Sequence, residues 1–193
     1  MMTHPKILAF AGSARKDSFN AKLVRIAASG ARAAGTEVTI LDLREFPLPL
    51  FDQDLEAENG TPENATKLKR AFMEHDGLLL ACPEYNSSIT PLLKNTIDWV
   101  SRAEEGESPL AAYRGKVAAL MAASPGALGG LRGLVHVRSI LSSIGVIVLP
   151  DQIAVPRAFE AFDSDGRMTD EKRQASVERL GRNVADMLVK LVD

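Results

Sequence analysis

The sequence predicts an α/β fold in which one five-stranded parallel sheet is doubly wound, with helices on both faces. Short apolar runs that suit buried strands alternate along the chain with longer segments of helical spacing. One of these runs, residues 77–82, is apolar nearly throughout, as buried parallel strands are. The length of 193 residues suits one compact domain. Because the chain also shows no internal repeat and no interdomain linker, we expect residues 1–193 to form a single domain.

The first half of the chain contains three of the expected strands. Its expected elements are a strand at 6–11, a helix at 20–34, a strand at 37–43, a helix at 63–75 and a strand at 77–82. The helix at 20–34 follows from apolar groups at helical spacing, namely Leu23, Ile26, Ala27 and Ala31. The segment 44–62 holds three prolines and a glycine, so we expect it to be a long surface loop.

The second half contains the remaining two strands. Its expected elements are a helix at 89–101, a strand at 116–122, a helix at 130–144, a strand at 145–149 and a helix at 169–192. Pro91 is tolerated because it falls in the first turn of its helix. Pro150 and Pro156 predict a loop before the last helix, for which Thr169 is the expected cap.

The composition excludes several classes of protein. The net charge of −2 gives neither the basic excess of a nucleic-acid binder nor the acidity of a carrier that docks on basic partners. Cys82 is the single cysteine, so no internal disulfide forms, which indicates a reducing compartment. The N-terminal residues lack the features of a secretory signal, and the apolar run 7–11 is too short to span a membrane. We therefore expect a cytoplasmic location, with no nucleic-acid or membrane partner.

The sequence shows neither a Ser-His-Asp set nor a cluster of metal ligands. His4, His75 and His136 fall on a terminus and two helices, where surface or packing roles are expected. Cys82 ends a buried strand and is interpreted as a small packing residue. Trp99 is expected to pack in the core or at a subunit contact.

The loops after the first, third and fourth strands are suited to binding a ligand, because ligands bind outside the carboxyl ends of the strands in such sheets. The first loop, Gly12–Asn20, offers hydroxyl groups, Arg15 and backbone N–H groups at a helix start, which together suit a phosphate. It matches neither the P-loop nor the G-x-G-x-x-G pattern. A plainer alternative is that Ser18 only caps the helix and Arg15 is solvated.

The second loop, Pro83–Ser88, follows the most apolar strand. Tyr85 offers it a flat face suited to a planar ring, and Asn86 can bond a polar ring edge. The third loop, Ser124–Gly130, has three glycines, which favour backbone lying against a flat ligand or a positive φ. The plainer alternatives are an ordinary turn with a half-buried Tyr85 and a merely flexible loop. Together the three loops fit a ligand with a phosphate at one end and a polar-rimmed aromatic ring at the other.

At these loops the sequence resembles the NADPH-dependent FMN reductases, a family of flavodoxin-like proteins that includes quinone, chromate and azo-dye reductases. The matching segments are GSARKDSFN, PEYNSSITPLLKNTIDWVSR and SPGALGG. The resemblance implies a flavodoxin-like fold. It also implies that Ser13, Arg15, Ser18 and Asn20 hold the phosphate of FMN, with Phe19 among the cofactor-binding residues. The isoalloxazine would be lined by Pro83, Glu84, Tyr85, Asn86 and Ser87 and approached from its other edge by Ser124 and Gly126.

The resemblance further implies a two-electron, ping-pong reductase. NAD(P)H would reduce the flavin at N5, and a quinone-like, azo or metal-oxyanion acceptor would then reoxidise it, with no catalytic side chain. The family is typically dimeric or tetrameric, with the helix carrying Leu93, Ile97 and Trp99 near the dimer interface. The alternatives are an electron carrier, a reductase that uses FMN as a loosely bound substrate, and a regulatory flavoprotein. The preference for NADPH or NADH and the physiological acceptor stay open at this point.

Overall fold

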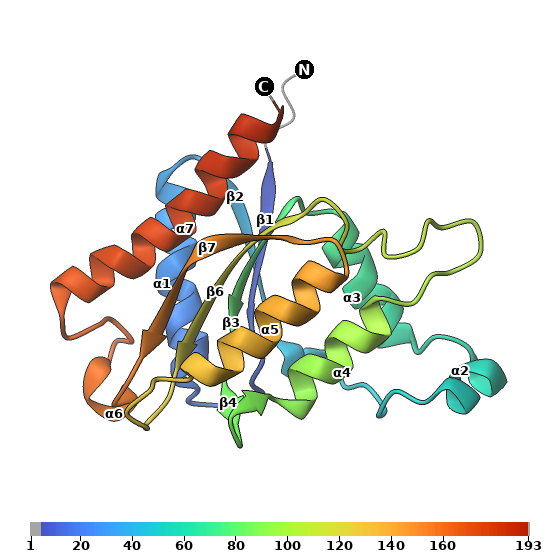
Figure 1. Cartoon of the computed structure of the whole chain (residues 1–193), viewed down its shortest axis with the longest axis horizontal. Coiled ribbons are helices and arrows are strands. Elements are labelled where there is room, and N and C mark those ends of the chain that lie inside the picture. Colours follow the sequence, from blue (N-terminus) through green and yellow to red (C-terminus); the bar gives the residue numbers. More distant parts are fainter. Residues whose placement is uncertain (1–4, 193) are drawn as a thin grey trace.

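The computed structural model describes residues 5–192 and contains the expected parallel sheet (Figure 1). The strand order is β2-β1-β3-β6-β7. These strands are β1 Lys6–Ala11, β2 Glu37–Leu41, β3 Gly77–Ala81, β6 Val117–Ala123 and β7 Ile147–Val155. The chain runs outward from β1 to β2 on one side and from β1 through β3 to β7 on the other. The order therefore reverses between β1 and β3, which is where such folds bind ligands.

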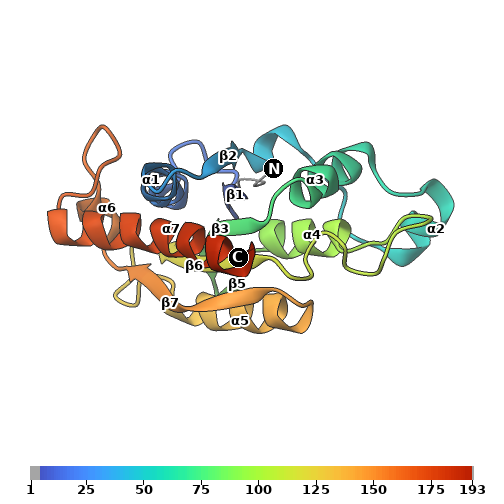
Figure 2. The ribbon, with the colours of Figure 1, turned by 90° about the horizontal axis from the view of Figure 1, so that it is seen from above.

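Helices cover both faces of the sheet, as predicted, and Figure 2 shows the two layers on either side of the twisted strands. One face carries α1 Phe19–Ala33 and α7 Glu171–Val192, and the other carries α3 Glu63–Met73, α4 Pro91–Val100 and α5 Leu131–Ser143. Successive residues of β1 alternate between the two cores: Ile7 and Ala9 face α1 and α7, whereas Leu8 and Phe10 face the other helices. No helix among the described residues is long and apolar enough to cross a membrane.

Helices α1 and α7 pack unusually close together because two glycines face their contact. A Cβ atom built on Gly30 would lie 1.9 Å from the carbonyl oxygen of Glu178, and one built on Gly181 would lie 1.8 Å from that of Ala27. Any side chain at either position would therefore push the helices apart. The contact lies in the second half of α1, at Ala27 and Gly30, and it holds this helix against α7 on one face of the sheet.

The segment 44–62 is not one long loop, so that prediction was wrong. It contains a short 3-10 helix at Leu43–Glu45 and α2 at Gln53–Asn59. Helix α2 forms because the Asp52 carboxylate accepts hydrogen bonds from the N–H groups of Asp54 and Leu55 at 2.8 and 3.2 Å. Gly60, with φ of 72°, ends it.

The segment 83–88 is also more ordered than predicted. It forms a small antiparallel hairpin, with β4 at Glu84–Tyr85 and β5 at Ser88–Ile89. The two turn residues, Asn86 and Ser87, have φ values of 50° and 67°. Two successive positive φ values are typical of the tight turns that join twisted strands.

The last strand and the last helix differ from their predicted bounds. Strand β7 continues past Pro150 to Val155, where a loop was expected. Pro150 is tolerated because β7 is an edge strand and its pairing with β6 shifts register between Ala118 and Leu120. A short helix, α6 at Ala158–Ala161, follows. The cap of α7 is Asp170 rather than Thr169, since the Asp170 carboxylate accepts from the N–H groups of Lys172 and Arg173.

Candidate functional site

A cleft of about 250 Å³ lies at the carboxyl ends of β1, β3 and β6. We call it the strand-tip cleft. It is lined by Ser13, Arg15, Ser18, Phe19, Asn20, Pro83, Glu84, Tyr85, Ala123, Ser124 and Pro125. All three predicted loops therefore contribute to one cavity. Asn86, Ser87 and Gly126 are not among its lining residues, and Ala123 and Pro125 were not predicted.

The first loop presents hydrogen-bond donors at the start of α1. Ser18 caps this helix, because its hydroxyl accepts from the N–H of Ala21 at 3.4 Å. Within residues 5–192, the backbone N–H groups of Ala14, Lys16 and Asp17 donate to no other group. Free N–H groups at the positive end of a helix dipole form a site for an anion.

Arg15 lies beside these donors and keeps much of its hydrogen-bonding capacity. Its Nη2 donates to the carbonyl oxygen of Asp17 at 2.9 Å, and its guanidinium lies 5.2 Å from the centre of the Phe19 ring. A guanidinium has five N–H donors, so this contact leaves several for a ligand. Arg15 is exposed, as the plainer interpretation assumed, yet it lines the cleft.

Asn20 connects the first loop to the third one. Its Nδ2 donates to the carbonyl oxygen of Ala123 at 2.8 Å, and its Oδ1 accepts from the N–H of Ala123 at 2.9 Å. Both ends of the amide are thus used inside the protein. The residue holds the start of α1 against the end of β6. Its backbone N–H, in contrast, donates to no other group within residues 5–192.

The hairpin β4–β5 forms another wall of the cleft. Tyr85 is 59% exposed, rather than half-buried in an ordinary turn, so its ring is free to contact a ligand. The Glu84 carboxylate is already used, because it accepts from the backbone N–H of Gly133 at 2.8 Å and pairs with Arg132 at 3.4 Å. These contacts anchor the hairpin to the first turn of α5. Thr90, the cap of α4, donates to the carbonyl oxygen of Gly12 at 2.8 Å and so fixes the hairpin's other end to the first loop.

The glycines of the third loop have different roles. Gly129 and Gly130 have positive φ values, and a Cβ atom on either would clash with the protein itself, near Val155 and Ala122 respectively. Gly126 has only the Ser124 hydroxyl nearby, 3.7 Å from an added Cβ. Two of the three glycines thus serve the turn, and only Gly126 leaves open space beside the cleft.

The other polar candidates lie away from the cleft chemistry. Cys82 is buried, and burial raises the pKa of its thiol far above its ordinary value. The buried His75 ring contacts the Ala71 carbonyl and the Thr39 hydroxyl. His136 is exposed and contacts Ser88, and His4 lies outside the described residues. Within residues 5–192, no group of three or more His, Cys, Asp or Glu side chains is placed to hold a metal ion.

Trp99 belongs to the core of the α4 face. Its ring is fully buried, its Nε1 donates to the Pro49 carbonyl at 2.8 Å, and it packs edge-on against Phe51. Leu93 and Ile97 are equally buried. These three side chains therefore cannot contact a second subunit directly. Any subunit contact of α4 would involve its exposed side chains.

Comparisons with known proteins agree with this geometry. The chain is 33% identical, over 90% of both sequences, to an NAD(P)H-dependent FMN reductase of Pseudomonas aeruginosa. It is 35% identical to an NAD(P)H:quinone oxidoreductase of Solanum tuberosum, over 86% of this chain and 84% of that protein. Among solved structures, a flavoenzyme NAD(P)H:(acceptor) oxidoreductase of Paracoccus denitrificans aligns with a TM-score of 0.80 and 30% identity, covering 96% of this chain and 98% of that one.

The family model described as NADPH-dependent FMN reductase matches residues 5–160. The chain belongs to this family. The reductase is accordingly an FMN-dependent NAD(P)H oxidoreductase with the flavodoxin-like fold that the resemblance implied. The matched range includes all three loops of the strand-tip cleft.

The donor set of the cleft fits FMN. Unpaired N–H groups and Arg15 at the α1 terminus suit the doubly charged phosphate. Pro83 and the exposed ring of Tyr85 supply apolar surface for a flat ring system. They lie on the second loop, whereas the anion site lies on the first. The reductase thus offers one cavity with the two kinds of surface that the cofactor requires.

Proposed function

We propose that the strand-tip cleft holds FMN and that the reductase transfers two electrons from NAD(P)H to a quinone-type acceptor in a ping-pong cycle. The observation that carries this proposal is the convergence of the three loops on one cleft, with anion donors at one side and an exposed aromatic ring at the other. Bound FMN supplies the redox chemistry by accepting a hydride and passing two electrons on.

The first loop is proposed to hold the phosphate. The N–H groups of Ala14, Lys16 and Asp17 are available to the anion, because within residues 5–192 they donate to no other group, and Arg15 adds a charged donor. The hydroxyls of Ser13 and Ser18 already accept backbone N–H groups, so they keep their own O–H for the phosphate. Asn20 is proposed to act indirectly, by holding this loop against Ala123.

The hairpin and the third loop are proposed to position the ring. Tyr85 lies along one side, and Ser124 and Pro125 lie along the other. Because the Glu84 carboxylate bonds Gly133 and Arg132, the hairpin keeps its place when substrates exchange. Asn86 and Ser87, at the hairpin tip, and Gly126 lie beyond the lining residues and are proposed to approach the ring edge through the backbone.

A quinone-type acceptor is supported by the similarity to the NAD(P)H:quinone oxidoreductase of Solanum tuberosum. The exposure of Tyr85 leaves the cleft open to solvent, so NAD(P)H and a planar acceptor can occupy the same place in turn. Azo and metal-oxyanion acceptors are proposed as further substrates of the same open cleft. No proton-donating side chain is assigned, since the one carboxylate among the residues that line the cleft is that of Glu84, which bonds Gly133 and Arg132.

We further propose a homo-oligomer of single-domain subunits in the cytoplasm. Leu131 and Val135 are exposed apolar side chains on α5, the helix to which the hairpin is anchored. A second copy that covers them would lie beside the cleft. The sedimentation coefficient of the purified protein tests this, since a monomer at working concentration would contradict it.

Steady-state kinetics test the proposed cycle. With NADPH and a benzoquinone varied together, a ping-pong cycle gives parallel double-reciprocal lines, and intersecting lines would contradict it. Two other outcomes favour the alternatives. A readily populated one-electron-reduced form during titration favours an electron carrier, and loss of FMN on gel filtration favours a reductase that uses FMN as a substrate.

A further inference from the structure

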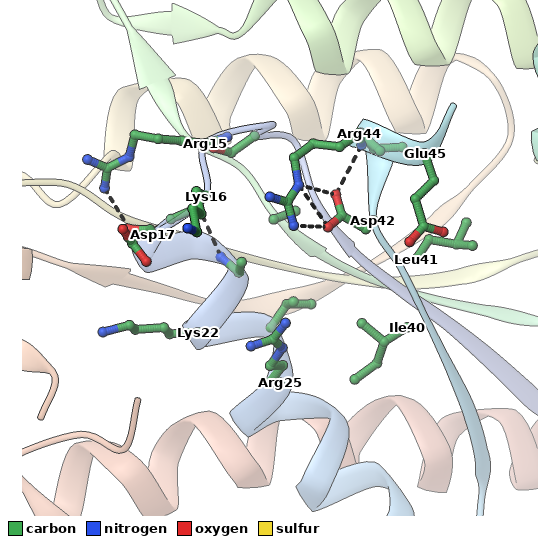
Figure 3. A pocket seen from close by; sticks show the side chains of 16 residues that line it. Arg15, Lys16, Asp17, Lys22, Arg25, Ile40, Leu41, Asp42, Arg44 and Glu45 are labelled. Atoms are coloured by element: carbon green, nitrogen blue, oxygen red, sulfur yellow. Dashed lines mark hydrogen bonds and ion pairs between the residues drawn. The ribbon is translucent and has the colours of Figure 1, made fainter. Parts of the chain in front are cut away.

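A second cavity, of about 340 Å³, lies next to the strand-tip cleft, and we call it the basic pocket (Figure 3). It is bounded by the first loop, the first two turns of α1 and the end of β2. Its lining includes the five cationic residues Arg15, Lys16, Lys22, Arg25 and Arg44 and the three acidic residues Asp17, Asp42 and Glu45. The lining therefore carries an excess of positive charge, although the whole chain has a net charge of −2.

Four of these cations make no ion pair within residues 5–192: Arg15 and Lys16 belong to the loop proposed to bind the FMN phosphate, which leaves Lys22 and Arg25 on α1 for another ligand. Arg44 is engaged, because its Nε donates to the two carboxylate oxygens of Asp42 at 3.1 and 2.9 Å. Hydrogen bonds from Arg44 also hold the pKa of Asp42 below its usual value, so this carboxylate stays charged and paired. In contrast, Lys22 and Arg25 make no ion pair within residues 5–192. They are one turn apart on α1, and both line the pocket (Figure 3).

The basic pocket and the strand-tip cleft share part of their wall. Ser13, Arg15 and Ser18 line both cavities. Each cavity alone is near or below the lower end of the roughly 300–1,000 Å³ that ligand pockets usually have. A ligand that reaches the flavin ring at one end can thus pass over the first loop and place its other end beside α1.

We propose that the basic pocket binds the 2′-phosphate of NADPH through Lys22 and Arg25, so that the reductase prefers NADPH to NADH. This inference rests on the proposed location of FMN in the strand-tip cleft, where the nicotinamide has to meet the ring. The 2′-phosphate is the group that distinguishes the two nucleotides, and it needs cations that are not already neutralised. Asp42 sits at the end of β2, where an unpaired acid would favour a 2′-hydroxyl instead, but Arg44 neutralises it.

The test compares nucleotide preference in FMN-loaded variants. Lys22→Gln, Arg25→Gln and the double variant remove the proposed phosphate ligands. Arg182→Gln is the matched control, because Arg182 is exposed on α7 and lines neither cavity. Its substitution removes the same charge as each single variant does. Each single substitution is expected to raise KM for NADPH about 5-fold and the double variant about 20-fold. KM for NADH is expected to stay unchanged in these variants. In the Arg182→Gln control, KM for NADPH and KM for NADH are both expected to stay unchanged.

A binding experiment makes the result independent of turnover. Adenosine 2′,5′-bisphosphate and adenosine 5′-monophosphate are titrated into the oxidised, FMN-loaded protein in a calorimeter. We expect the bisphosphate to bind at least about 10-fold more tightly, and the double variant to lose that difference while its melting temperature stays that of the wild type. Equal affinity for the two probes in the wild type would overturn the inference, as would equal effects of the substitutions on NADPH and NADH.

Three results separate this inference from the proposed function. If NADPH and NADH both reduce the bound FMN but the substitutions do not discriminate between them, the proposed function stands and the 2′-phosphate site alone is wrong. If the purified protein carries FAD and the double variant releases it, the pocket holds the adenylate of a flavin, and the inference is overturned. If neither nucleotide reduces the flavin, both proposals fall.

Discussion

The side-chain amide of Asn20 is bonded at both ends to the backbone of a single residue, Ala123, at 2.8 and 2.9 Å. Asn20 lies in the first turn of α1, and Ala123 is the last residue of β6. The pair therefore ties the loop proposed to bind the phosphate to the loop proposed to border the ring. It sets the distance between the two halves of the strand-tip cleft without needing a ligand.

Replacing Asn20 by Asp tests this connection. The substitution keeps the acceptor for the Ala123 N–H but turns the donor into an oxygen that faces the Ala123 carbonyl, inside the protein. We expect the FMN-free protein to lose about 1–3 kcal/mol of unfolding free energy and its affinity for FMN to fall. Urea unfolding and quenching of flavin fluorescence measure the two effects. Asn59→Asp, on an exposed helix end, is the control, and equal effects of the two substitutions would contradict the role of Asn20.

Replacing Arg15 by Gln tests the proposed phosphate site. Because Arg15 is exposed and its side chain contacts just the Asp17 carbonyl and the Phe19 ring among the described residues, the fold should be unaffected. The affinity for FMN is expected to fall about 10-fold, since a charge-assisted hydrogen bond is lost. Riboflavin, which has no phosphate, should bind the variant and the wild type equally. A parallel loss of riboflavin binding would place Arg15 at the ring instead.

Gly181→Ala tests the close contact of α1 and α7. The new Cβ atom would lie 1.8 Å from the Ala27 carbonyl oxygen, so the helices have to separate. We expect a loss of about 3 kcal/mol in unfolding free energy, near the upper range for overpacking. Gly126→Ala is the control for stability, because its Cβ atom meets only the Ser124 hydroxyl at 3.7 Å. Wild-type stability of the Gly181 variant would show that the contact is not rigid.

Glu107→Gln tests the ion pair that holds the segment after α4. Lys69 is buried on α3 and pairs with Glu107 and, at 3.6 Å, with Glu104. The hydrogen bond from Lys69 lowers the pKa of Glu107 below its usual value of 4.5. Because the pKa of Glu107 is lower in the folded state, its charged form adds to the free energy of unfolding at pH values above 4.5. This stabilisation is lost as the pH falls through the folded-state pKa. The variant should therefore be less stable than wild type at pH 7, and the difference should shrink in acid. A difference that is constant with pH would contradict the pairing.

Much of the fold follows from the sequence because apolar periodicity reports burial directly. The run at 77–82 predicts β3, and the spacing of Leu23 and Ile26 predicts α1. The errors arise where a local polar group decides the structure. Asp52 caps a helix that no apolar pattern indicates, and two positive φ values turn Asn86 and Ser87 into a hairpin. Strand β7 continues past Pro150 because an edge strand pairs with only one neighbour, so it can lack a backbone N–H donor at one position.

The site was predicted in part for a similar reason. Loops that directly follow strands converge in this topology, so Ser13, Arg15 and Tyr85 could be placed together before the structure was known. Lys22 and Arg25 could not, since in the sequence they are two ordinary charges on a helix. Only the packing of α1 beside the end of β2 makes them walls of a cavity. Asn20 likewise gives no sign in the sequence that its amide bonds Ala123.

Anaerobic titration of the purified, FMN-loaded protein with NADPH tests the central claim most directly. The visible absorbance of the flavin is followed as NADPH is added and then as a benzoquinone is added. We predict that one equivalent of NADPH bleaches the flavin completely and that one equivalent of quinone restores it. Flavin that stays oxidised in excess NADPH, or that stays reduced in the presence of the quinone, would contradict a two-electron reductase.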